Sequence, residues 1–190
     1  MTSTFAARPT GTTLPCRYVI KVPTDDCDAP GLATCLLSRE AIVGRKVCHP
    51  HLITVLDANV HQPPYYLVTP LLPGHTLREY LDSRLDLELN FILWVVRQTA
   101  EGLAALHCQH WLHGDVKPEN ILIAPDGHVT LLDLGFARQL NEENIITDQV
   151  VMGTCNYLAP EVATPTMDVG PGSDLARRAG VRAEGRPGQR

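Results

Sequence analysis

Three short polar motifs in the second half of the chain hold the residue types that phosphoryl transfer needs. They are His-Gly-Asp-Val-Lys-Pro-Glu-Asn at 113–120, Asp-Leu-Gly at 133–135 and Ala-Pro-Glu at 159–161. Phosphoryl transfer to a hydroxyl needs a carboxylate that orients the hydroxyl, oxygen ligands for Mg²⁺ and a cation beside the phosphate. The residues that match these needs are Asp115, Asn120, Asp133 and Lys117.

The spacing of these residues fits a single site. Asp115 and Asn120 are five positions apart, so one loop can present a base beside a metal ligand. Two apolar runs, 121–123 and 129–132, flank an Asp-Gly turn, and this arrangement predicts a β-hairpin. Such a hairpin returns the chain and brings Asp133 next to Asn120.

The first third of the chain predicts strands around one helix. Residues 17–22 form a short β-rich run, and further strands are expected at 52–56 and 65–68. Residues 32–45 have a helical pattern. The apolar positions that this helix would bury are Leu36, Leu37, Ala41 and Val43.

Two helices are predicted further along the chain. Thr76 and Glu79 have the spacing of a capping box, which places a helix start at Thr76. Residues 90–107 are helical in pattern and apolar on almost every side, as is typical of a helix buried in a larger domain. Together with the strands, these helices indicate an α+β fold.

Composition narrows the class of protein. The chain has 190 residues, 44% of them hydrophobic, and a formal net charge of −5. That size suits one domain, or a domain and a fragment, and the charge argues against a nucleic-acid partner. No apolar run reaches 18 residues and the first residues do not resemble a signal peptide, so we expect no membrane span.

The cysteines and the last residues add two expectations. Six cysteines stand at irregular spacing without a Cys-x-x-Cys pair, which favours reduced thiols and a cytoplasmic location; a secreted, disulfide-bonded form is the alternative. Residues 171–190 are rich in Arg and Gly and predict a disordered basic tail. A nucleic-acid or membrane-surface arm is the alternative for this tail.

Taken together and in this order, the three motifs resemble those of the protein kinase family, most closely the eukaryotic-type Ser/Thr kinases of bacteria. The resemblance implies a two-lobed fold, ATP and Mg²⁺ as cofactors, and a protein substrate with Ser or Thr hydroxyls. By it, Asp115 is the catalytic base and Lys117 steadies the γ-phosphate. Asn120 and Asp133 would bind Mg²⁺. Small-molecule kinases of the same fold share part of the first motif and are the alternative.

The resemblance extends toward the N-terminus. Tyr-Val-Ile-Lys at 18–21 stands where the family has its ATP-contacting lysine, so Lys21 would contact the α- and β-phosphates and Glu40 would be its partner on the helix. Two unrelated surface charges are the alternative.

The resemblance also implies an adenine pocket. Val19 and Leu122 would hold the base between them, and Thr69 would be the gatekeeper. The C=O of Pro70 and the N–H of Leu72 would bind the edge of the adenine.

Two departures from the family pattern have consequences. Gly114 replaces an Arg that normally pairs with a phosphate on the activation loop. We therefore expect activity that is independent of phosphorylation at Thr147 or Thr154. Leu134 replaces a Phe, a mild change because both are apolar. A zinc site built from the nearby histidines at 107, 110 and 113 is a remote alternative for this region.

The resemblance divides the chain into an N-lobe at 1–69, a hinge at 70–74, a partial C-lobe at 75–170 and the tail. The glycine-rich loop and much of the C-lobe have no counterpart, so we expect a domain truncated at both ends. Asp174 would hold the backbone of the catalytic loop. The alternative function is an inert or merely nucleotide-binding fragment, with a protein partner that covers the exposed C-lobe surface.

Overall fold

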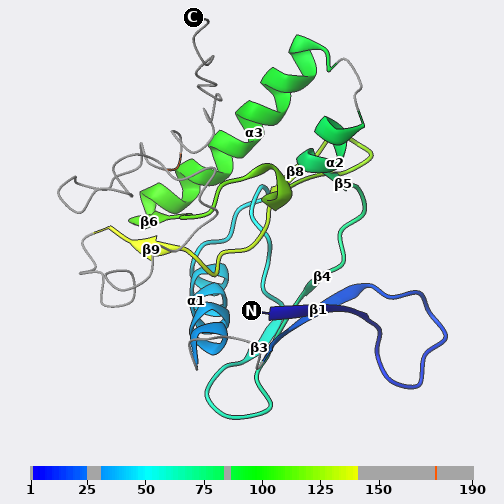
Figure 1. The fold of residues 1–190 in the computed structure, drawn as a ribbon, viewed down its shortest axis with the longest axis vertical. Helices are drawn as coiled ribbons and strands as arrows, with labels where there is room; N and C mark the ends of the chain where they lie inside the picture. Colours follow the sequence, from blue (N-terminus) through cyan, green and yellow to red (C-terminus); the bar gives the residue numbers. More distant parts are fainter. Residues whose placement is uncertain (1, 25–30, 84–86, 141–173, 175–190) are drawn as a thin grey trace, which may run out of the picture.

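The computed structural model describes residues 2–24, 31–83, 87–140 and Asp174. These residues form two groups of elements that follow one another along the chain (Figure 1). The sheet lobe contains strands β1 to β4 and helix α1, and the helical lobe contains β5 to β9 with helices α2 and α3. The α+β class and the β-rich first lobe expected from the sequence are both confirmed.

The sheet lobe is a four-stranded antiparallel sheet with one helix. The strands lie in the order β1 (Thr2–Ala7), β2 (Tyr18–Pro23), β4 (Tyr66–Pro70), β3 (Asp57–Asn59). Helix α1 (Leu32–Lys46) buries Leu37 and Ala41 against Leu67 of β4. The strand predicted at 17–22, the strand predicted at 65–68 and the helix predicted at 32–45 are therefore confirmed. Leu36 is only partly buried.

The strand predicted at 52–56 is wrong, because β3 begins only at Asp57. Residues 52–56 form a connector between the lobes. The N–H of Ile53 donates to Leu131 O at 2.9 Å, whereas the N–H of Leu56 donates to Val68 O at 2.8 Å in the other lobe. The run is apolar because it crosses two cores, and this burial gives the same pattern as a strand buried on both faces.

The helical lobe is built around a long helix and a hairpin. Its strands are β5 (His75–Thr76), β6 (Trp111–Leu112), β7 (Ile121–Ile123), β8 (Val129–Leu131) and β9 (Arg138–Gln139). Its helices are α2 (Leu77–Asp82), α3 (Leu89–Cys108) and a 3-10 turn η1 (Pro118–Asn120). The predicted hairpin is confirmed, since β7 pairs antiparallel with β8. The capping box is confirmed as well, with both of its reciprocal hydrogen bonds formed.

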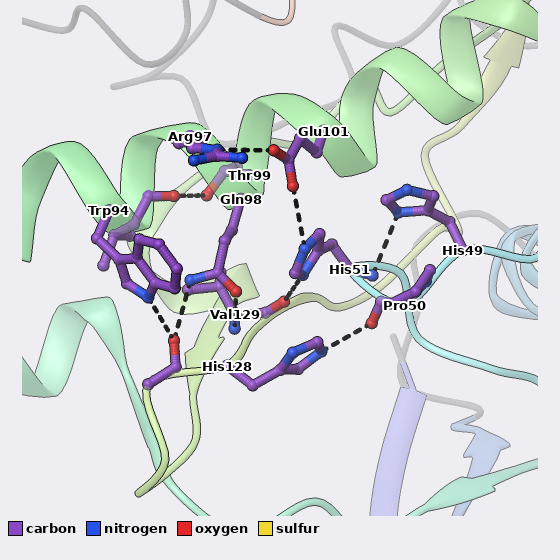
Figure 2. A network of polar contacts seen from close by, with 12 residues as sticks. His49, Pro50, His51, Trp94, Arg97, Gln98, Thr99, Glu101, His128 and Val129 are labelled. Atoms are coloured by element: carbon purple, nitrogen blue, oxygen red, sulfur yellow. Dashed lines mark hydrogen bonds and ion pairs between the residues drawn. The ribbon is translucent and has the colours of Figure 1, made fainter.

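A polar network joins α3 to the β7–β8 turn and to the residues just before the connector (Figure 2). Trp94 Nε1 and Gln98 Nε2 each donate to Gly127 O at 3.0 Å. Gln98 also accepts from the N–H of Val129 at 3.1 Å. The ring of His51, the residue just before the connector, donates to Val129 O at 2.8 Å. The hairpin is thus held at its turn, far from the ends where Asn120 and Asp133 lie.

Helix α3 is more exposed than its sequence predicts. It buries six residues, but five large apolar side chains on its other side are 39% to 69% exposed: Leu89, Ile92, Leu93, Trp94 and Val96. A partner for this surface stays a prediction. Among the described residues, no helix has the length and apolar character that a membrane span requires. The tail at 171–190 lies outside the described residues, apart from Asp174.

Candidate active site

Three charged side chains meet where the two lobes face each other. Lys21 Nζ lies 2.6 Å from Glu40 Oε2 and 3.3 Å from Asp133 Oδ1. These residues come from β2, from α1 and from the residues that follow β8. The structure therefore brings together the lysine, the helix carboxylate and one predicted metal ligand, so the alternative of two unrelated surface charges is wrong.

Burial and mutual attraction set the charge state of this triad. Burial alone would lower the pKa of Lys21, but the carboxylates of Glu40 and Asp133 raise it above its ordinary value. Burial raises the pKa of Glu40 to about 7 against the opposing effect of Lys21. Burial would also raise the pKa of Asp133, but the Lys21 ammonium and the Gly135 N–H hold it below its ordinary value. The site therefore keeps a cation and an anionic oxygen ligand side by side.

The Asp-x-Gly spacing has a clear structural cause. Asp133 has φ +58°, a left-handed conformation that is uncommon outside glycine, and its Oδ1 accepts from the N–H of Gly135 at 3.2 Å. A Cβ on Gly135 would lie 3.3 Å from Leu36 O on α1. The glycine therefore lets α1 approach closely. The N–H of Leu134 also donates to the Glu40 carboxylate, and Leu134 itself is fully buried.

The loop before β7 holds the predicted base among polar partners. Asp115 is buried, and its Oδ2 lies 2.7 Å from Lys117 Nζ. Asn120 Nδ2 donates to the same Oδ2 at 3.1 Å and to the backbone O of Asp115 at 2.9 Å. The turn η1 presents Asn120, as the five-residue spacing predicts.

Asp174 fastens the backbone of this loop. Its carboxylate accepts from the N–H of His113 at 2.8 Å, from the N–H of Gly114 at 3.0 Å and from His107 Nε2 at 2.9 Å. Burial alone would raise the pKa of Asp174, but these hydrogen bonds hold it below its ordinary value. The role expected for Asp174 from the sequence is borne out by these contacts.

Gly114 occupies a position where its backbone demands glycine. Its φ is +78°, and a Cβ there would lie 2.2 Å from Phe136 O. Gly114, the residue that departs from the family pattern, is therefore required here both by the backbone conformation and by the close contact with Phe136. Thr147 and Thr154, whose phosphorylation bears on this departure, lie outside the described residues, as do residues 159–161.

A cavity of about 370 Å³ opens beside the triad. Its volume is within the range of small-molecule sites in proteins. It is lined from both lobes by Thr2, Lys21, Leu36, Leu37, Glu40, Asp115, Lys117, Asp133, Gly135 and Phe136. Five of these lining residues were not expected at the site from the sequence: Thr2, Leu36, Leu37, Gly135 and Phe136. Only Gly135 carried a usable signal, because it stands two residues after a predicted ligand.

The residues expected to contact adenine do not line this cavity. Val19 lies opposite Thr69 in the β2–β4 pairing, and Leu122 lies opposite Thr76 in the β5–β7 pairing. Pro70 is the last residue of β4, and Leu72 packs against the core of the helical lobe. Their contact with a base stays a prediction.

Comparison with known proteins identifies the group that this geometry belongs to. A family model described as a protein kinase domain matches residues 16–175. The serine/threonine-protein kinase PknL of Mycobacterium tuberculosis is 41% identical over 110 residues, which cover 58% of this chain and 28% of that protein. PrkC of Bacillus subtilis, another serine/threonine-protein kinase, is 32% identical over 125 residues, covering 66% and 19%. The chain spans 16% to 28% of the length of such relatives.

Proposed function

The chain belongs to the protein kinase family, and from that membership we propose that it transfers the γ-phosphate of ATP to Ser or Thr hydroxyls of a protein. The observation that carries the proposal is the triad of Lys21, Glu40 and Asp133 beside the buried carboxylate of Asp115. The curated relatives are named as serine/threonine kinases, and this supports the substrate class.

The donor set fits a magnesium ion and a nucleotide. Mg²⁺ prefers oxygen ligands, and Asp133 offers a carboxylate held in its charged form. The side-chain amide of Asn120 points its nitrogen at Asp115, and its oxygen accepts no hydrogen bond from the described residues. The ion would be held by these two side chains and would supply charge neutralisation at the phosphates.

Each of these residues would have its own role in the transfer. Lys21 would bind the α- and β-phosphates, and Glu40 would hold the ammonium in place. Asp115 would accept the hydroxyl proton of the substrate at its carboxylate. Lys117, 2.7 Å from that carboxylate, would balance the negative charge and orient the γ-phosphate. Asp174 keeps the loop backbone rigid, so that the base does not move during the transfer.

The four described cysteines, at positions 16, 35, 48 and 108, are free thiols. Free thiols are usual in the reducing cytoplasm, where ATP is abundant. We therefore propose that the protein is located in the cytoplasm.

The first test is calorimetric titration of the purified chain with Mg²⁺–ATP. We expect saturable binding that Asp133→Asn abolishes, because the amide cannot supply an anionic ligand. Asp82→Asn, at an exposed position on α2, is the matched control and should bind like the wild type. Transfer of labelled phosphate to a mixed Ser/Thr peptide pool then tests Asp115→Asn. This variant should still bind Mg²⁺–ATP but should lose transfer.

Two results would contradict the proposal. A folded chain that binds no Mg²⁺–ATP would favour the inert fragment and would redirect work to its protein partners. Binding without transfer in the wild type would leave a nucleotide-binding module.

A further inference from the structure

Trp111 is a buried aromatic residue to which the proposed chemistry assigns no role. It lies on β6, two residues before His113, and its exposed fraction is 6%. The guanidinium carbon of Arg39 lies 5.9 Å from the centroid of its ring, and Lys46 Nζ lies 5.8 Å from it. Both cations belong to α1. One indole ring of the helical lobe therefore contacts two charged side chains of the helix that carries Glu40.

The pattern along α1 explains this contact. Arg39, Val43 and Lys46 stand at positions i, i+4 and i+7, which share one face of a helix. Val43 is fully buried and belongs to the same core cluster as Trp111. The apolar centre of this face packs into the helical lobe, and a cation stands on each side of it. Arg39 is partly buried and Lys46 is exposed. Because water weakens the attraction between a cation and an indole ring, we expect Arg39 to contribute more than Lys46.

The position of the ring links this face to both parts of the site. Arg39 is the residue before Glu40, whose carboxylate lies 2.6 Å from Lys21 Nζ. After Trp111 the chain passes through Leu112 directly into the loop with Asp115. β6 is also paired with β9, where Trp111 lies opposite Gln139, so the ring sits on a fixed support. A shift of α1 away from the ring would move Glu40 away from Lys21.

We propose that Trp111 is a positioning residue that holds α1 through Arg39 and Lys46, so that Glu40 keeps its ion pair with Lys21. The inference rests on the proposed function, because the ion pair matters through the phosphates that Lys21 would bind. Trp111 acts through Glu40 and touches neither nucleotide nor substrate.

The test is a double-mutant cycle that measures the dissociation constant of Mg²⁺–ATP. Trp111→Leu keeps an apolar side chain and removes the aromatic face, and it should weaken binding about tenfold. Trp111→Phe keeps a ring and should recover most of that affinity. Ile42→Ala is the matched control, because Ile42 lies on the exposed side of the same helix. It should change affinity less than twofold.

The Glu40→Gln background separates positioning from general stability. If Trp111 acts through Glu40, adding Trp111→Leu to Glu40→Gln should weaken binding less than twofold further, because the two changes share one route. An undiminished tenfold loss in that background would overturn the proposal and leave Trp111 as an ordinary core residue.

Hydrogen exchange tests the role of Trp111 even if the wild type binds no nucleotide. Hydrogen exchange of the α1 amides should be faster in Trp111→Leu than in the wild type, while the α3 amides keep their protection. Unchanged α1 exchange, or equal loosening of α1 and α3, would overturn the inference without involving the kinase reaction.

Discussion

Replacing Asp174 by alanine should greatly lower the free energy of unfolding of the protein. The carboxylate is 1% exposed and accepts hydrogen bonds from the backbone N–H groups of His113 and Gly114 and from the ring of His107. Alanine leaves both buried N–H groups without an acceptor. Each unsatisfied buried donor costs about 1–3 kcal/mol. The two amides together predict a loss of about 2–6 kcal/mol, a large part of the stability of an ordinary domain.

Asp174 should also affect how the free energy of unfolding depends on pH. The pKa of Asp174 is lower in the folded protein than in the unfolded chain, because its hydrogen bonds outweigh its burial. The folded state therefore binds the proton more weakly. The stabilisation from Asp174 is complete at neutral pH and is lost as the pH falls below about 4. The Asp174→Ala variant should lack this part of the acid slope.

The assay is urea unfolding followed by circular dichroism at several pH values. Asp82→Ala is the matched control: its side chain is 68% exposed and forms a surface ion pair, so its loss should cost less than about 1 kcal/mol. Equal unfolding midpoints for Asp174→Ala and Asp82→Ala at pH 7 would refute the reasoning. So would an unchanged acid slope in Asp174→Ala.

Three further predictions use the same measurement. Gly114→Ala should lower the free energy of unfolding by about 2–4 kcal/mol, because a left-handed φ is combined with a Cβ 2.2 Å from Phe136 O. Gly11→Ala has nearly the same φ but open space around it, and it should cost about 1 kcal/mol. Equal losses in the two variants would refute the steric contribution. Glu40 has a pKa of about 7 in the folded protein, above its ordinary value, so its ionisation favours the unfolded chain. The contribution of Glu40 to stability should fall as the pH rises from about 4.5 to about 7, and Glu40→Gln should remove that part of the slope; a variant with the wild-type slope would contradict the assignment. Thr76→Ala removes a capping box and should cost about 1 kcal/mol, with no change at all as the contrary result.

Much of the site could be predicted because its residues obey local rules. Asp115 and Asn120 share one loop, and the Asp-Gly turn sets the hairpin that returns the chain to Asp133. The capping box at Thr76 is also a local signal, complete within four residues. In each case the partners are close in sequence, so spacing alone predicts their contact.

The other features could not be predicted, either because one sequence pattern has two possible physical causes or because the contact has no local signal. Residues 52–56 are apolar because they pass between two cores, but a buried strand has the same composition. The contacts of Trp111 with α1 have no local signal, since Arg39 and Lys46 lie far from it in sequence. The lining residue Thr2 was missed for the same reason, because it is far in sequence from the predicted site residues.

The connector has a consequence for how the chain folds during synthesis. The N–H of Ile53 and the ring of His51, the residue just before the connector, donate to backbone carbonyls of β8, and His51 and Val129 are 78 positions apart in the sequence. The sheet lobe comes first in the sequence, but the first part of the segment between α1 and β3 cannot make these bonds until β8 has left the ribosome. Contacts of such long range slow folding, because a large loop must close before they form. The two lobes should therefore complete their folding together, late in translation, and unfold in a single transition.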